Sequence, residues 1–132
     1  MIVDSSAIMA ILNSEPESRG FATVLAATRH ARISAGTLVE LSIVVDGRGD
    51  PVRSAWLDPF LAETRIEVVD VTAEHARFAR EAHHEFGRGS GHPARLNFGD
   101  CFSYALAKAT GEPLLFKGDG FIHTDLTPAV PL

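Results

Sequence analysis

The chain has 132 residues, of which 45% are hydrophobic and 22% charged, as is typical of a globular domain. Its net charge of −5 argues against broad electrostatic binding of nucleic acid, which normally shows as an excess of lysine and arginine. A single cysteine, Cys101, excludes an intrachain disulfide. The sequence shows neither the ~20-residue apolar run of a membrane span nor a signal peptide. We therefore expect one cytoplasmic domain over residues 1–132, without a membrane segment.

The first half of the chain alternates between short apolar runs and amphipathic stretches. This pattern predicts strands near 1–4 and 32–34, and helices near 5–12, 16–28, 37–45 and 52–63. The stretch 37–45 is apolar almost all round, which predicts a buried helix, although its β-branched residues leave a strand open.

The second half continues the alternation. It predicts strands at 66–71 and 113–116, helices at 72–86 and 100–110, a glycine-rich loop at 87–96 and an edge strand at 125–130. Alternating strands and helices indicate a three-layer α/β/α fold with a central parallel sheet of four to five short strands.

The stretch 97–107 reads as a helix start that carries a carboxylate. Asn97 and Asp100 have the spacing of a capping box. Apolar residues recur at helical period behind them and predict a core face: Phe98, Phe102, Ala105 and Ala109. Asp100 lies off this stripe, so its carboxylate either only caps the helix or points into a site.

Three further acids stand out by their position. Asp4 ends the first strand, Glu40 interrupts an apolar run without a basic neighbour, and Asp119 lies in a Gly-Asp-Gly loop after a strand. Each has a purely structural alternative: Asp4 as a helix cap, Glu40 as a side chain that reaches solvent, and Asp119 as a turn residue. Strand ends and helix starts converge on one edge of an α/β sheet, and carboxylates gathered there repel one another unless a cation intervenes. Oxygen ligands suit Mg²⁺ or Mn²⁺.

Four motifs, in order along the whole chain, resemble a PIN domain. They are residues 2–7 (IVDSSA), 38–42 (LVELS), 96–107 (LNFGDCFSYALA) and 113–118 (PLLFKG). More narrowly, the sequence is similar to the VapC-type toxin ribonucleases of bacterial toxin–antitoxin pairs. The resemblance implies an endoribonuclease that depends on Mg²⁺ or Mn²⁺ and cleaves single-stranded regions of tRNA, rRNA or mRNA. It also implies a homodimer that a cognate VapB-type antitoxin inhibits.

The resemblance assigns an acidic triad to Asp4, Glu40 and Asp100, as metal ligands and catalytic groups. The fourth acid departs from the family pattern, in which an acid directly precedes a phenylalanine. Here glycine holds that place and the acid has moved to Asp119, whereas Asp125 matches a Thr-Asp pair of the family. Either Asp119 or Asp125 completes the site, and we favour Asp119.

Substrate binding is predicted from charge and position. Arg88, Arg95 and Lys117 lie in the loops next to these acids and are the best-placed cations for phosphates, with ordinary surface charges as the alternative. Ser5 is a hydrogen-bond donor to a phosphate or a metal-bound water, whereas Ser6 is expected to cap the first helix.

Other readings of the sequence predict different chemistry. A phosphatase that uses an aspartyl nucleophile resembles this chain at its start, but such families have a second aspartate where Ser6 stands. A receiver-like domain needs an acid after a middle strand, and residues 34–36 offer none. The remaining alternative is a catalytically inactive PIN-like domain that binds RNA or a partner, against which the intact triad argues.

Overall fold

A four-stranded parallel sheet forms the centre of the computed structural model, which describes residues 1–131. The strands are β1 (Ile2–Val3), β2 (Arg32–Ser34), β3 (Glu67–Val69) and β4 (Leu114–Leu115), in the order β3-β2-β1-β4. Ile2 of β1 pairs with Arg32 on one side and with Leu114 on the other. The predicted edge strand at 125–130 was wrong, since it forms only an isolated bridge between Leu114 and Pro128.

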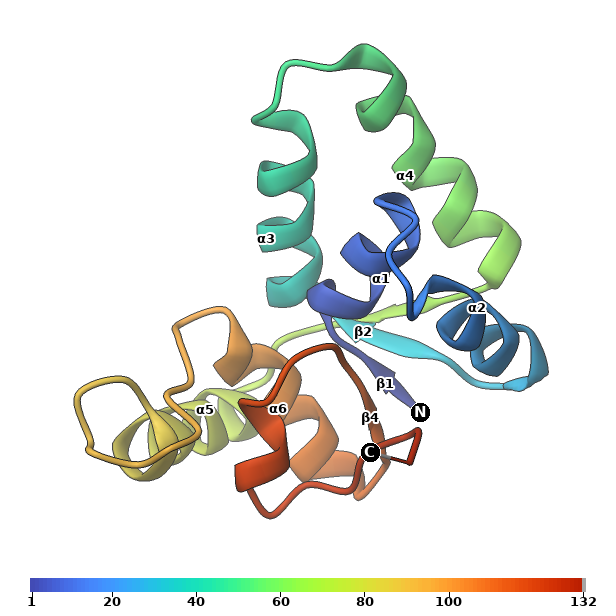
Figure 1. Ribbon diagram of the computed structural model, residues 1–132. Helices are drawn as coiled ribbons and strands as arrows, with labels where there is room; N and C mark the ends of the chain where they lie inside the picture. Colours follow the sequence, from blue (N-terminus) through green and yellow to red (C-terminus); the bar gives the residue numbers. More distant parts are fainter. Residues whose placement is uncertain (132) are drawn as a thin grey trace.

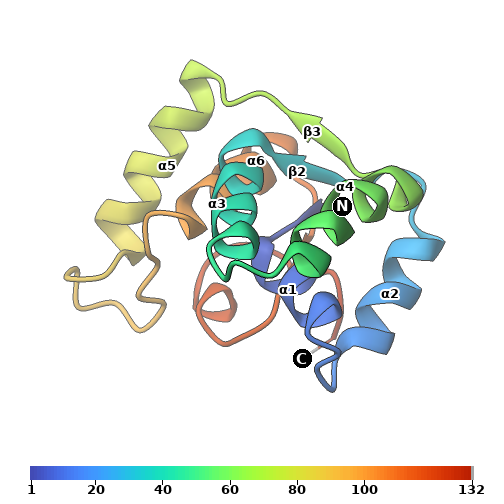
Figure 2. The ribbon, with the colours of Figure 1, turned by 90° about the horizontal axis from the view of Figure 1, so that it is seen from above.

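Helices cover both faces of this sheet (Figure 1). One side carries α1 (Ser5–Leu12), α2 (Ser18–Ala27), α3 (Ala35–Asp46) and α4 (Pro51–Thr64). The other carries α5 (Ala73–Phe86), α6 (Asp100–Thr110) and the 3₁₀ turn η1 (Phe121–His123). The view from above shows α5 at the left side of the molecule, on the side opposite α2 (Figure 2). The three-layer α/β/α fold is confirmed.

The pleat of the short strands divides the core between the two helical layers. Val3 and Leu115 pack in the cluster under α1–α4, whereas Ile2 and Leu114 pack in the cluster with α5 and α6. Successive residues of a strand point to opposite faces, so both must be apolar when helices cover both sides. This explains why the strands read as continuous apolar runs.

Two predictions about the core were wrong. The helix α3 is not buried all round, because Val39 and Ile43 are 59% and 66% exposed. Phe98 belongs to the loop before α6 and is 79% exposed, so it is no part of a core face. Periodicity identifies which residues share a face, but it does not say whether another element covers that face.

The topology fixes where the candidate acids meet. The carboxyl ends of parallel strands lie at one edge of the sheet. Asp4 follows β1, α3 begins directly after β2, and the loop with Asp119 follows β4. Among the helices of residues 1–131, none combines the length and apolarity needed to cross a membrane.

Candidate active site

Asp4 is a buried carboxylate at the junction of β1 and α1. It is 3% exposed and caps α1 by accepting the amide hydrogen of Ser6 on Oδ2, at 3.0 Å. The hydroxyl of Ser6 donates to the same oxygen at 2.6 Å, and the hydroxyl of Ser103 donates to Oδ1 at 2.5 Å. Asp4 is therefore both the cap of α1 and an acid whose orientation is fixed by hydrogen bonds. Ser6 does not cap the helix as predicted; its hydroxyl donates to Asp4 instead.

Glu40 reaches the same edge of the sheet from α3. Its Oε1 accepts a hydrogen bond from the hydroxyl of Ser5 at 3.2 Å. Its carboxylate lies so close to Gly99 that a Cβ atom there would stand 1.6 Å from Oε2. Burial raises the pKa of Glu40, the charge of Asp4 raises it further, and the hydrogen bond from Ser5 opposes both.

Asp100 begins α6 and forms the predicted capping box. The amide of Asn97 donates to Oδ2 of Asp100, and the amide of Asp100 donates to Oδ1 of Asn97, each at 2.9 Å. Burial raises the pKa of Asp100 to about 6, and the charges of Asp4 and Glu40 raise it too, against the Asn97 hydrogen bond and the charge of Arg88. The charges of Asp4 and Glu40 therefore both act on Asp100, and the charge of Asp4 acts on Glu40.

A cavity of about 620 Å³ opens over this edge of the sheet. Asp4, Asp100 and Asp119 all line it, together with residues of the glycine-rich loop and of the loop after β4. Glu40 does not line it, and faces instead a neighbouring apolar groove of about 400 Å³ between α3 and the loop before α6. Glu40 nevertheless lies close to Gly99, which directly precedes Asp100 in the chain.

The four candidate acids of residues 1–131 are not preassembled as a metal-binding site. In the described part of the chain, no three acidic, histidine or cysteine side chains come together as a group that would hold an ion as they stand. Oxygens of Asp4, Glu40 and Asp100 are engaged instead by protein donors. The donor set still fits a hard divalent cation, because such ions prefer carboxylate oxygens and a positive charge would offset the effects that raise the pKa values of Glu40 and Asp100.

The structure separates the two candidates for the fourth acid. Asp119 lines the cavity with Asp4 and Asp100. Asp125 accepts a hydrogen bond from the hydroxyl of Tyr104 at 2.7 Å and forms an ion pair with Lys108. Asp125 therefore ties the segment after η1 to α6, away from the cavity.

The predicted substrate-binding residues have different surroundings. Arg88 and Arg95 are exposed and line the cavity, and Arg95 adopts the left-handed backbone region with φ 49°. Lys117 also lines it, but its ammonium is paired with Glu15 and Glu17. Ser5 donates to Glu40, so its hydroxyl is already engaged.

Two polar residues of the site were missed from the sequence. Ser103 and Thr37 are fully buried, and their hydroxyl oxygens lie 3.1 Å apart. Ser103 donates to Asp4, as described above. The available signal was a hydroxyl residue one helical turn from Asp100 and another one turn from Glu40, each inside an otherwise apolar stretch.

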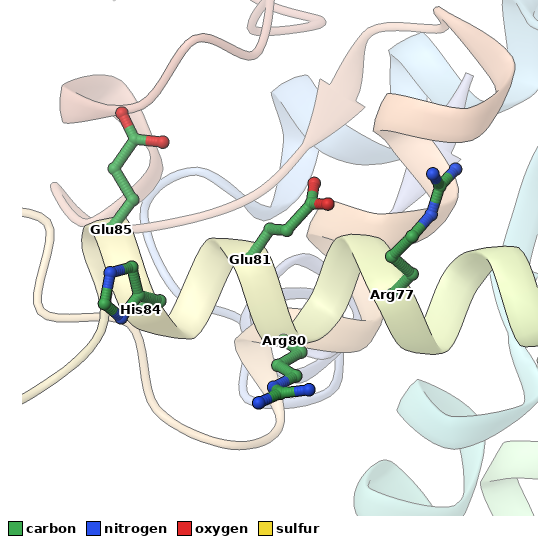
Figure 3. Close-up of a pocket in the computed structure, with 5 residues that line it drawn as sticks. All are labelled: Arg77, Arg80, Glu81, His84 and Glu85. Carbon is green, nitrogen blue, oxygen red and sulfur yellow. The ribbon is translucent and has the colours of Figure 1, made fainter.

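A further hollow lies on α5, outside this cluster (Figure 3). All five residues that line it belong to this one helix: Arg77, Arg80, Glu81, His84 and Glu85. Both acidic and basic side chains line it, as on a solvated helix face, and none of the four candidate acids belongs to it.

The comparison with known families fits this geometry. The PIN domain family model matches residues 1–126, which is nearly the whole chain. The chain therefore belongs to the PIN domain family.

Proteins of similar sequence indicate which group within the PIN family the chain falls into. Ribonuclease VapC28 of Mycobacterium tuberculosis is 51% identical over 130 residues, and ribonuclease VapC42 of the same species is 49% identical over 129 residues. Each alignment covers 98% of both chains. Within the PIN family, the chain thus falls among the VapC ribonucleases.

Solved structures show the same fold at low sequence identity. The M. tuberculosis toxin VapC20, described as cleaving the sarcin–ricin loop, superposes with a TM-score of 0.76 at 19% identity and covers 98% of both chains. A toxin–antitoxin complex from Klebsiella pneumoniae contains a chain with a TM-score of 0.61 at 13% identity, over 86% of this chain and 82% of that one.

Proposed function

We propose that the chain is the toxin of a toxin–antitoxin pair, a cytoplasmic endoribonuclease that hydrolyses single-stranded regions of RNA with Mg²⁺ or Mn²⁺. One observation carries the proposal: Asp4, Glu40 and Asp100 come from three different elements to the carboxyl edge of the sheet, where burial and the charges of Asp4 and Glu40 raise the pKa of Asp100. An arrangement that sets like charges together without paired cations is unfavourable for the fold alone, which points to a functional role.

In this proposal, each acid has a part in holding the divalent ion. Asp4 and Asp100 would bind it, with Glu40 and Asp119 as further direct or water-mediated ligands. When bound, the ion supplies positive charge to offset phosphate and protein, and it activates water for in-line attack on the phosphodiester. Asp4 is suited to be a metal ligand of fixed orientation, because hydrogen bonds from Ser6 and Ser103 hold its carboxylate oxygens in place.

The cations of the cavity fit the phosphate backbone of a substrate. Arg88 and Arg95 are exposed at its wall and free of the ion pairs that engage Lys117. We assign phosphate contacts to the two arginines, whereas Lys117 would have to leave Glu15 and Glu17 to join them. Ser5 would act through Glu40.

Cleavage of total RNA by the purified protein tests the proposal. The wild type should cleave with Mn²⁺ and stop with EDTA. Asp100→Asn should abolish cleavage with the fold retained, because asparagine keeps the cap acceptor and loses the ligand charge. Asp125→Asn is the matched control and should still cleave, since Asp125 lies outside the cavity. Undiminished metal-dependent cleavage by Asp100→Asn would refute the assignment.

We also propose a partner protein, because the chain is similar to VapC toxins. The resemblance to VapC toxins and the toxin–antitoxin complex among the structural relatives support a VapB-type antitoxin as inhibitor. Addition of the protein encoded by the adjacent reading frame should suppress cleavage by the wild type; an unchanged rate would contradict this.

The second candidate function is a PIN-like domain that binds RNA or a partner without cleaving. The observation in its favour is that no three ligand side chains within residues 1–131 are grouped to hold an ion as they stand. Calorimetric titration with Mn²⁺ separates the two. Binding by the wild type that Asp100→Asn weakens supports the nuclease, whereas no binding at millimolar Mn²⁺ supports the inactive domain.

A further inference from the structure

Behind the acids, two buried hydroxyl groups connect the elements that carry them. Thr37 of α3 and Ser103 of α6 are both 0% exposed, and their hydroxyl oxygens lie 3.1 Å apart. Ser103 also contacts Asp4 Oδ1 at 2.5 Å. Buried polar groups are retained at a free-energy cost unless they are hydrogen-bonded, and here each hydroxyl finds its partner in the other or in Asp4.

The direction of these hydrogen bonds follows from chemistry. A carboxylate accepts and does not donate, so the hydrogen of Ser103 points to Asp4. The oxygen of Ser103 is then the acceptor for Thr37, whose hydroxyl must be the donor. The result is a one-way chain from Thr37 through Ser103 to Asp4.

The chain also has a fixed place relative to the other two acids. Thr37 stands three residues before Glu40 on α3, and Ser103 stands three residues after Asp100 on α6. Residues with this spacing lie on the same side of a helix. Each helix therefore brings one acid to the site and one hydroxyl beneath it.

The hydrogen bonds leave Asp4 little freedom. Its Oδ2 accepts from the amide and from the hydroxyl of Ser6, which fills the two lone pairs of that oxygen. Its Oδ1 accepts from Ser103 and retains one further lone pair. A bound cation would thus meet Asp4 through Oδ1, the atom that Ser103 holds.

We propose that Ser103 and Thr37 are positioning residues that orient Asp4 and set the spacing of Asp4, Glu40 and Asp100 for a divalent cation. This inference rests on the proposed metal-dependent function. Groups that hydrogen-bond to metal ligands typically change metal affinity or activity by about 10- to 100-fold when they are removed.

Mn²⁺ titration of the purified full-length protein by calorimetry tests the inference, with Mn²⁺ alone as the probe. Ser103→Ala should weaken Mn²⁺ binding about 10- to 100-fold. Thr37→Val keeps the side-chain shape but lacks the hydroxyl, and should weaken binding less. Thr37→Ser returns the hydroxyl and should restore binding, which a merely space-filling role for Thr37 would not predict.

Ser42→Ala is the matched control. Ser42 lies on α3, is half-buried, and donates only to the carbonyl of Leu38 in its own helix, so its loss should leave Mn²⁺ affinity unchanged. Wild-type affinity in Ser103→Ala overturns the inference while the proposed function stands. If Ser103→Ala does not fold, wild-type affinity in Thr37→Val overturns it equally. A wild-type protein that binds no Mn²⁺ overturns the proposed function and this inference together.

Discussion

Burial raises the pKa of the Asp100 carboxyl from 3.8 to about 6, and the neighbouring charges of Asp4 and Glu40 raise it too. Between about pH 4 and pH 6, the folded protein therefore holds a proton that the unfolded chain has released. The free energy of unfolding falls as the pH rises through this window and stays lower above it. The raised pKa of Glu40 acts in the same direction.

Asp100→Asn removes the contribution of Asp100 to this pH dependence and leaves that of Glu40. Without the metal, in EDTA, we expect the variant to be more stable than the wild type at neutral pH, by about 1–2 kcal/mol once solvent contact is allowed for. Urea unfolding at several pH values measures the effect. Asp125→Asn should lose stability instead, because hydrogen bonds from Lys108 and Tyr104 lower the pKa of Asp125 despite its burial. The raised pKa of Asp100 would be contradicted if the free energy of unfolding of the wild type stayed constant or rose with pH in this window, and if Asp100→Asn gave no gain in stability.

At the level of elements, the site depends on how closely α3 approaches the start of α6. Gly99 has an ordinary backbone conformation, with φ −64°, so its role is spatial rather than conformational. A Cβ atom at this position would meet the Glu40 carboxylate, the end of a flexible side chain that can move away. The fold should therefore tolerate a methyl group that the acidic cluster cannot.

Gly99→Ala tests this separation of stability from function. We expect an unchanged or slightly altered melting temperature, together with a loss of kcat/KM on RNA of about 100-fold, as for a catalytic group displaced by an ångström. Gly20→Ala on the exposed face of α2 is the control, because a Cβ atom there meets nothing within 4 Å. Full activity in Gly99→Ala would mean that Glu40 has no fixed position in the reaction.

The elements themselves were largely predictable from the sequence. The capping-box spacing predicted the start of α6, where Asn97 and Asp100 bond reciprocally. The predicted helix at 72–86 is α5, which Thr72 caps by accepting from the amide of His75. What could not be predicted is which apolar faces are covered. Phe98 and Ile43 have the spacing of core residues, yet their side chains are 79% and 66% exposed.

The acidic residues were found in the sequence by position and resemblance, whereas their support was not. Ser103 and Thr37 are distant along the chain, and their contact exists only after α3 and α6 have packed together. Hydroxyl residues are common on helices, so their spacing of one turn from Asp100 and Glu40 is only a weak signal in the sequence. Likewise, only the fold shows that Lys117 is paired with Glu15 and Glu17.

For the molecule as a whole, four of the eight exposed large apolar residues within residues 1–131 lie together beside the site. We call Val39, Ile43, Val44 and Phe98 the α3 face; they line one groove together with Glu40. Contiguous exposed apolar patches usually mark interaction surfaces, and the centres of such surfaces are poor in charged residues. Because the resemblance to VapC toxins implies a homodimer, we expect a second copy of the chain to cover this face.

Ile43→Lys places a charge in the middle of the α3 face, where burial in a dimer would leave it without a partner. We expect the solution mass, measured by light scattering at equal protein concentration, to fall from that of a dimer to that of a monomer. Val52→Lys is the matched control, because Val52 is 78% exposed on α4 and does not line the groove, and this variant should remain dimeric. A dimer that persists in Ile43→Lys would place the contact between copies elsewhere. A wild type that is monomeric at these concentrations would contradict the homodimer that the resemblance implies. It would leave the acidic site unaffected, since Asp4, Glu40, Asp100 and Asp119 all come from one chain.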